Sequence, residues 1–332
     1  MLKVEPGYVD HQYLATANDY FNQIKNHSYR LMNITPDAHV LDIGCGSGID
    51  THKLANLDTP PRSIIGVDHD PDMIAVAQET AHSMDYYQIE YFTASAYQLP
   101  FANNRFNAVR CERVFMHLEN PELALAEAIR ITAPGGHIVI VDTDWGSLST
   151  HNTCPSTEFR LKQFSAEKIL KNGYSGRQLK SLFSELMVIP TKEHDNSTKV
   201  AASSNFSLSL STSITQNTFN QHPSEQTTPT QDKIENQTSS DLSDHHKISS
   251  LACTKTLFNL QLFTHAVVVN DYDTWKYLTQ SDMIEEAAVN NGILSRQELN
   301  QWRTNLQVLQ EKNQFFSTIS VTTAHAQKAF DT

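Results

Sequence analysis

Residues 41–48 read Leu41-Asp42-Ile43-Gly44-Cys45-Gly46-Ser47-Gly48, with three glycines at alternate positions directly after an apolar run. This run, residues 39–43, is short and is typical of a buried parallel strand. Glycine lacks a Cβ atom, so the loop can adopt positive φ angles and a ligand can lie against its backbone. A helix over residues 49–57 would direct its first amides into the same crevice. The sequence therefore predicts a ligand site formed by main chain at the end of the strand.

The spacing of the glycines argues against two common nucleotide sites. A G-x-G-x-x-G fingerprint needs glycine at position 49, where the chain has Ile49, and this disfavours an NAD-dependent oxidoreductase. No phosphate-binding G-x-x-x-x-G-K-[ST] loop lies nearby. A second apolar run, residues 63–67, ends in Asp68, and a carboxylate at this place binds ribose hydroxyls. The pattern favours a nucleoside without phosphates as the ligand.

Further motifs follow the glycine loop in the order of a known family. They are Gly66-Val67-Asp68, Gln98-Leu99-Pro100-Phe101, residues 105–109, and Pro134-Gly135-Gly136 within residues 130–140. Together they resemble the motifs of class I S-adenosylmethionine-dependent methyltransferases, and their common order is more specific than any one of them. Residues 141–145 and 174–179 are similar to one subgroup, the small-molecule methyltransferases related to ubiquinone and menaquinone biosynthesis.

The resemblance and the alternation of strands and helices predict an α/β fold. We expect a Rossmann-like, doubly wound, mostly parallel seven-stranded sheet with an antiparallel last strand, an N-terminal helical cover and a long polar insertion. A single domain over residues 1–332 would comprise the cover (10–35), the core (36–192), a flexible polar insertion (193–252) and C-terminal strands and helices that complete the fold (253–332).

Apolar periodicity and turn residues predict the individual elements. Strands are expected near residues 39–43, 63–67, 89–94, 107–111, 137–142, 257–269 and 315–324. Helices are expected near residues 49–57, 72–82, 121–132, 274–290 and 295–310, the last of them opening with a capping box at Ser295 and Glu298.

Composition narrows the classes of partner. The chain has 332 residues, 39% of them hydrophobic, and a net charge of −12 that opposes binding to nucleic acid. No apolar run approaches the length of a membrane span, and the first residues have no signal-peptide core, so we expect a cytoplasmic protein. The four cysteines are scattered without C-x-x-C pairs, and no metal site is expected. The serine- and threonine-rich residues 193–252 are expected to be flexible and are a candidate surface for contact with a protein partner.

The resemblance also implies S-adenosyl-L-methionine as cofactor and assigns residues to it. The methionine part would lie along Asp42, Gly44, Cys45 and Gly46, the ribose on Asp68, and the adenine against His69 and Met73. Relatives place an aspartate before alanine after the third strand, where this chain has Ser95 and Ala96; a hydroxyl accepts a hydrogen bond more weakly than a carboxylate, by about 1 kcal/mol. Cys111 lies where relatives contact the cofactor through main chain, and a structural thiol is the alternative.

Catalytic candidates are few. His117 occupies a position that is histidine in many relatives and could orient or deprotonate a substrate hydroxyl; a hydrogen-bonded structural histidine is the alternative. Asp142, Asp144 and Trp145 follow the fifth strand, where loops of this architecture face the cleft. Arg177 is a candidate for binding an anionic substrate or for anchoring a loop.

The sequence thus predicts a methyltransferase that transfers a methyl group from S-adenosylmethionine to a small organic molecule by in-line displacement. The alternative is a methyltransferase-fold protein that acts as a binding module without efficient catalysis.

Overall fold

A computed structural model describes residues 11–185 and 257–330. The predicted insertion at residues 193–252, with its proposed protein contact, lies outside the described residues. The extension of a single domain over residues 1–332 therefore stays a prediction.

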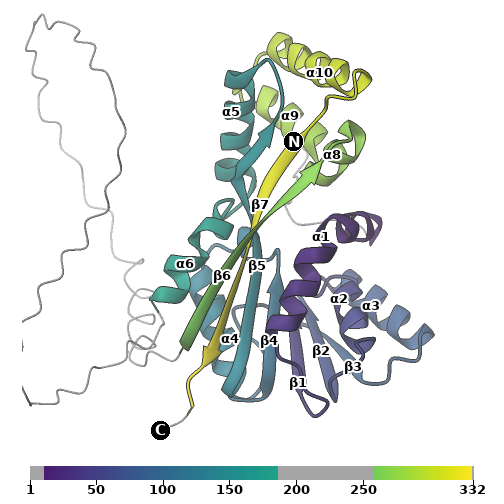
Figure 1. The fold of residues 1–332 in the computed structure, drawn as a ribbon, viewed down its shortest axis with the longest axis vertical. Helices are drawn as coiled ribbons and strands as arrows, with labels where there is room; N and C mark the ends of the chain where they lie inside the picture. The colour runs from purple at the N-terminus through teal and green to yellow at the C-terminus, as the bar shows by residue number, and fades with distance from the viewer. Residues whose placement is uncertain (1–10, 186–256, 331–332) are drawn as a thin grey trace, which may run out of the picture. The chain divides into compact units, whose positions relative to one another are not determined.

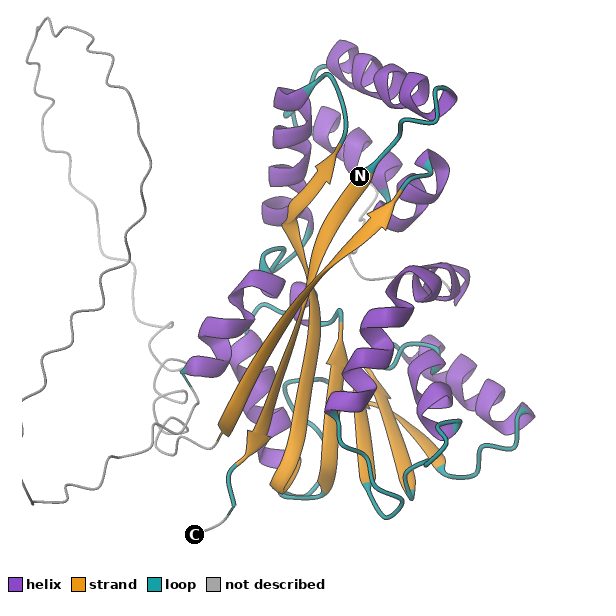
Figure 2. Cartoon of the chain, in the orientation of Figure 1, coloured by secondary structure: helices purple, strands orange, loops and turns teal. Residues whose placement is uncertain are grey.

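The described residues form an α/β fold around one seven-stranded sheet (Figure 1, Figure 2). The strands are β1 (His39–Ile43), β2 (Ser63–Asp68), β3 (Ile89–Thr93), β4 (Phe106–Glu112), β5 (Thr132–Thr150), β6 (Leu257–Val269) and β7 (Ser317–Lys328), in the spatial order β3-β2-β1-β4-β5-β7-β6. β1 to β5 pair in parallel, and β7 runs antiparallel to both β5 and β6. The mostly parallel sheet with an antiparallel last strand is confirmed.

Helices cover both faces of the sheet. They are α1 (His11–Leu31), α2 (Ile49–Ala55), α3 (Pro71–Ser83), α4 (Pro121–Ile131), α5 (Pro155–Phe164), α6 (Ser175–Ser184), α8 (Tyr272–Thr279), α9 (Ser281–Asn290) and α10 (Arg296–Glu311), with a 3-10 turn at Phe115–His117 and a π-helical turn at Ser165–Ile169. Strand side chains alternate between the faces, so Val40 packs with α1, α2 and α3 while Leu41 packs with α4 and α6.

Three long strands carry a third apolar cluster, beyond the two that flank the sheet. β5, β6 and β7 extend past the other strands toward α5, α8, α9 and α10 (Figure 1). These helices pack around Trp275, Leu299, Trp302 and Leu306, which are all nearly fully buried. We call α5, the π-helical turn after it and α8 to α10 the cap.

Two predicted elements differ from the structure. The strand expected at 137–142 is part of β5, which spans Thr132–Thr150, because Thr132 pairs with Phe106 of β4 before this stretch and pairing with β7 continues to Thr150 after it. The helix expected at 274–290 is two helices, since Gln280 between them adopts a left-handed φ of +52°. The predicted capping box is confirmed: the Ser295 side chain accepts from the Glu298 amide, and the Glu298 carboxylate accepts from the Ser295 amide.

Candidate functional site

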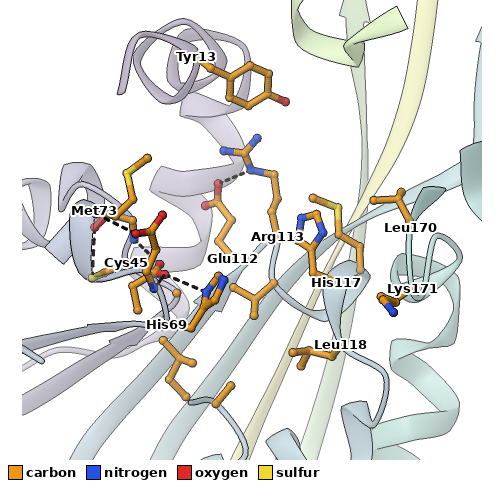
Figure 3. Close-up of a pocket in the computed structure, with 18 of the residues that line it drawn as sticks. Tyr13, Cys45, His69, Met73, Glu112, Arg113, His117, Leu118, Leu170 and Lys171 are labelled. Carbon is orange, nitrogen blue, oxygen red and sulfur yellow. Dashed lines mark hydrogen bonds and ion pairs between the residues drawn. The ribbon is translucent and has the colours of Figure 1, made fainter. Parts of the chain in front are cut away.

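A cavity of about 500 Å³ lies where β1, β2 and β4 end (Figure 3). The glycine loop after β1 forms one part of its wall, and the turn between α8 and α9 forms another. The wall includes nine of the predicted site residues, namely Gly44, Cys45, Gly46, Asp68, His69, Met73, Ser95, Ala96 and His117. The fold thus gathers most of the sequence-predicted residues around one cavity.

The glycine loop is held close to the strands on either side of it. The Gly44 amide donates to the Val67 carbonyl over 2.7 Å, and Gly44 has a φ of +75°. A Cβ atom on Gly44 would lie 2.2 Å from Cγ2 of Val114. This position therefore excludes any side chain and leaves bare backbone facing the cavity.

Asp68 at the end of β2 links this loop to the next helix. Its Oδ2 accepts from the Gly46 amide over 2.8 Å, and its Oδ1 accepts from the Asp70 amide over 3.0 Å and lies 3.1 Å from Nδ1 of His69. Burial raises the pKa of Asp68, but the hydrogen bonds from His69 and the two amides together outweigh burial and hold that pKa below its usual range. Asp68 is therefore a carboxylate at neutral pH and presents acceptor oxygens at the wall of the cavity.

His69 is largely solvent-exposed, and its hydrogen bond to Asp68 raises the pKa of its imidazole. The Asp70 side chain caps α3 by accepting from the amides of Asp72 and Met73. Ser95 also lies at the wall, and its hydroxyl oxygen accepts from the Tyr97 amide over 3.2 Å. Around the carboxylate of Asp68 the cavity thus has an imidazole, a thioether and a hydroxyl.

The structure does not bring two predicted residues to the cavity wall. Asp42 faces α1 from the middle of the sheet, where its carboxylate accepts from the Arg110 guanidinium over 3.1 Å. Cys111 is 1% exposed in the apolar core on the other face. Burial raises the pKa of the Cys111 thiol well above its usual value, which fits a structural thiol.

Asp42 belongs to a buried cluster of charges that sequence reasoning missed. Arg110 is 1% exposed and ion-pairs with Asp42, with Glu112 and, at 3.6 Å, with Asp50. Lys25 of α1 joins the same carboxylates, 2.5 Å from Asp50 and 2.9 Å from Glu112. The signal was available: Asp42 and Arg110 are opposite charges on adjacent buried strands, and the two residues are direct register partners.

These contacts shift the pKa values of the acids in different directions. Burial raises the pKa of Asp42 to about 7, against the attraction of Arg110. Burial also opposes ionisation of Asp50 and Glu112, but the cations Arg110 and Lys25 outweigh it and hold both pKa values below their usual range. Asp42 is thus the acid of this cluster that gains a proton near neutral pH.

The opposite end of the cavity is more apolar and faces the cap. Met116, Trp145, Leu278 and Met283 line it, and the Trp145 indole N–H donates to the Met116 sulfur over 3.2 Å. Trp145 reaches this place because the β5–β7 register shifts between Asp144 and Ser149. The expectation that Trp145 faces the cleft thus agrees with its position in the wall.

His117 lies at the same end, and in the described part of the chain its buried Nδ1 has no hydrogen-bond partner. Burial lowers the pKa of His117 to about 4, and the positive charge of Arg113 adds to the effect. The imidazole is therefore neutral at physiological pH and has a lone pair available to a ligand.

The remaining candidates support the wall from behind. Asp142 is fully buried and accepts from the Met116 amide, the Thr143 amide and the Ser175 hydroxyl. Asp144 binds Arg177 through a bond of 2.7 Å from Nε. Neither of these acids nor Arg177 lines the cavity, so the contact of Arg177 matches its loop-anchoring alternative.

Residues 11–185 and 257–330 contain neither a membrane-spanning helix nor a cluster of metal ligands. No helix there is long and apolar enough to cross a membrane. No three His, Cys, Asp or Glu side chains in these ranges are grouped to hold a metal ion.

Comparisons with known proteins agree with this geometry. Residues 41–140, which contain the glycine loop and β2 to β4, match the family model for a methyltransferase domain. An uncharacterized 37.1 kDa protein in transposon TN4556 of Streptomyces fradiae is 31% identical over 178 residues, which are 54% of this chain and 50% of that protein. The demethylmenaquinone methyltransferase of Bacillus licheniformis is 31% identical over 119 residues, 36% of this chain and 50% of the enzyme. The chain thus spans about half the length of the curated relatives it matches.

A solved structure shares the fold. The YcgJ protein from Bacillus subtilis aligns with a TM-score of 0.51 over 95% of this chain and 100% of its own, at 13% identity. At this identity the likeness concerns the fold alone. The family model identifies residues 41–140 as a methyltransferase domain, and 119 residues of the chain are similar to a demethylmenaquinone methyltransferase.

Proposed function

We propose that this chain transfers the methyl group of S-adenosylmethionine to a small organic molecule by in-line displacement. The observation that carries the proposal is the cavity of about 500 Å³, whose wall runs from the family's glycine loop to an apolar end formed by the cap. Methyl transfer needs little from a protein beyond alignment of the acceptor with the methyl group, and a cavity with two unlike ends can hold the two molecules end to end.

The residues present fit the cofactor. The backbone of Gly44 and Gly46 suits the methionine part, because both residues adopt a positive φ and a Cβ on Gly44 would collide with Val114, so the loop faces the cavity with main chain. The ionised Asp68 suits the ribose hydroxyls, and His69, Met73, Ser95 and Ala96 surround the place of the adenine. We keep Asp42 and Cys111 as supports of this site from behind the wall. The bound cofactor would supply an electrophilic methyl group on a sulfonium.

The apolar end would bind the acceptor and exclude water from it. Met116, Trp145, Leu278 and Met283 offer apolar contacts there. We propose that the neutral His117 accepts a hydrogen bond from the acceptor and orients the reacting atom. With a pKa of about 4 the imidazole is a weak base, so orientation suits it better than full proton abstraction.

The size and charge of the protein favour a small acceptor. The cavity volume is within the range of about 300–1,000 Å³ that small-molecule sites occupy. A net charge of −12 opposes nucleic acid as a substrate. A relative named demethylmenaquinone methyltransferase is consistent with a small organic acceptor, without fixing which one.

The test combines binding and transfer. Isothermal titration with S-adenosylhomocysteine should show one site per chain, while NAD, a matched nucleotide without the amino-acid part, should not bind. The protein should then move labelled methyl from S-adenosylmethionine into a small-molecule extract. Absence of S-adenosylhomocysteine binding would refute the proposal, and binding without transfer to any fraction would favour the binding-module alternative.

A further inference from the structure

Arg113, the residue directly after β4, has an unusual backbone conformation. Its φ is +54°, in the left-handed region that costs a residue with a Cβ roughly 1–2 kcal/mol. Its amide donates to the Val141 carbonyl over 2.8 Å, which holds the chain in this turn. Strain of this kind persists where the surrounding structure enforces it, and it often accompanies a functional site. The turn directs the Arg113 side chain into the cavity (Figure 3).

The guanidinium of Arg113 has unused hydrogen-bonding capacity. It lies 4.8 Å from the ring centre of Phe21, and its Nε is 3.4 Å from Glu112 Oε1. Glu112 already binds both Lys25 and Arg110. Among residues 11–185 and 257–330 the guanidinium makes no hydrogen bond, although the side chain is only 14% exposed. A guanidinium has five N–H donors in a planar fork that matches a carboxylate, so a ligand with an anionic oxygen would satisfy them.

Arg113 belongs to the acceptor end of the cavity. It also lines an adjoining apolar hollow of about 50 Å³ with Phe21, Met116, Trp145 and Leu278. None of the glycine-loop residues lines that hollow. The positive charge of Arg113 also lowers the pKa of His117, which places the two side chains within electrostatic reach of each other.

The charged side chains at this part of the cavity wall, with Asp42 behind them, favour an anion. Three cations, Lys25, Arg110 and Arg113, stand with the acids Asp42, Asp50 and Glu112. Because burial raises the pKa of Asp42 to about 7, this group of six carries excess positive charge whenever Asp42 is protonated. A neutral or negatively charged surface would show no such preference for an acidic ligand.

We propose that Arg113 binds an anionic oxygen of the methyl acceptor. The acceptor is then an aromatic or apolar acid, and His117 orients its reacting atom. This inference rests on the proposed function and specifies the substrate class of the same site. Phe21 and Trp145 supply the aromatic contacts, and the guanidinium supplies the charge.

The experiment uses probes because the acceptor itself is not identified. Benzoate and its neutral analogue benzamide are titrated into the full chain saturated with S-adenosylhomocysteine. The variants are Arg113→Gln, Arg113→Lys and, as a matched control, Arg105→Gln, since Arg105 also lies over aromatic rings but is exposed outside the cavity. The affinities of all variants for S-adenosylhomocysteine and for 5′-methylthioadenosine, which lacks the amino-acid part, are measured alongside.

We expect benzoate to bind the wild-type complex with a Kd of about 1 mM, and R113Q to weaken it about tenfold or more. R113K should retain most of the benzoate affinity, and R105Q all of it. Benzamide binding should not depend on Arg113. These results would support an acidic acceptor.

Three results would overturn the inference while leaving the proposed function in place: equal benzoate binding by wild type and R113Q, equal binding of benzoate and benzamide by the wild type, or R113Q weakening S-adenosylhomocysteine but not 5′-methylthioadenosine. The last result would assign Arg113 to the cofactor's carboxylate. Failure of the wild type to bind S-adenosylhomocysteine would instead refute the proposed function, and the inference with it.

Discussion

One carboxylate oxygen of Asp68 accepts a hydrogen bond of 2.8 Å from the backbone amide of Gly46, so the end of β2 fastens the glycine loop that follows β1. The same carboxylate lies at the cavity wall, where the ribose is proposed to bind. One side chain therefore combines a structural role with the proposed ribose-binding role.

Asp68→Asn is expected to weaken S-adenosylhomocysteine binding by about tenfold or more, because hydrogen bonds to a charged group contribute roughly 1.5–3 kcal/mol. Calorimetry measures the affinity. Asp72→Asn is the matched control, since Asp72 is an exposed acid in the first turn of α3. Equal affinity of D68N and wild type would contradict the ribose assignment.

Gly44→Ala is expected to destabilise the fold and to abolish cofactor binding. The added Cβ would lie 2.2 Å from Val114 Cγ2, and the residue needs a φ of +75°. Gly292→Ala is the control for φ alone, because Gly292 has a φ of +71° with no atom within 4 Å of its Cβ position. Urea unfolding should give about 1 kcal/mol for G292A and a larger loss for G44A. Adding Val114→Ala to G44A should restore the unfolding free energy that G44A loses beyond the loss in G292A. Equal losses of unfolding free energy in G44A and G292A would exclude the clash.

Ser95→Asp is expected to tighten S-adenosylhomocysteine binding about fivefold, because a carboxylate accepts a hydrogen bond from the adenine amino group more strongly than a hydroxyl, by about 1 kcal/mol. Ser95→Asn, of nearly the same shape without the charge, should bring no such gain. Competition titrations with the two variants measure the difference. A weaker S95D than wild type would place the adenine elsewhere.

Arg110→Met is expected to cost about 3–5 kcal/mol of unfolding free energy, because it leaves buried carboxylates without their main cation. Adding Asp42→Asn should restore part of the loss, since it removes one of those charges. The exposed Arg105→Met should change stability little. An R110M as stable as wild type in urea would mean that Lys25 alone neutralises the cluster.

Acid is expected to destabilise the fold through His325 of β7. Burial, with a contribution from stacked His137, lowers the pKa of His325 to about 4. Between pH 6.5 and 4 the unfolded chain therefore binds a proton that the folded chain does not, so stability is full above pH 6.5 and falls as pH decreases. His325→Gln should flatten this slope by up to about 1.4 kcal/mol per pH unit. Urea unfolding at several pH values measures this slope, and the exposed His151→Gln is the control for removal of a histidine.

The sequence predicted the sheet and the glycine loop well because both depend on local patterns. Alternating apolar runs and the Ser295 capping box each act within a few residues, and β6 lies at its predicted bounds. The antiparallel last strand came from the family resemblance rather than from periodicity.

The positions of the charged residues Asp42, Arg110 and Arg113 could not be predicted in the same way. Asp42 belongs to the glycine motif, and only the register of β1 with β4 shows that it faces Arg110 rather than the cavity. The position of Arg113 could not be predicted because it depends on a left-handed backbone conformation at a residue that is neither glycine nor asparagine. The end of α8 at Gln280 could not be predicted for the same reason.

The pairing of β5 with β7 runs from His137 to Thr150 with a register shift between Asp144 and Ser149, and this has a consequence for how the proposed substrate could change. The apolar end of the cavity has Trp145 from this ladder and residues of α8 and α9, whereas the glycine loop at the other end follows β1, so different elements hold the two ends. Replacements at Leu278 of α8 or Met283 of α9 would alter which acceptor is bound without altering how the donor is held. Selectivity and donor binding can therefore evolve, or be engineered, as separable modules.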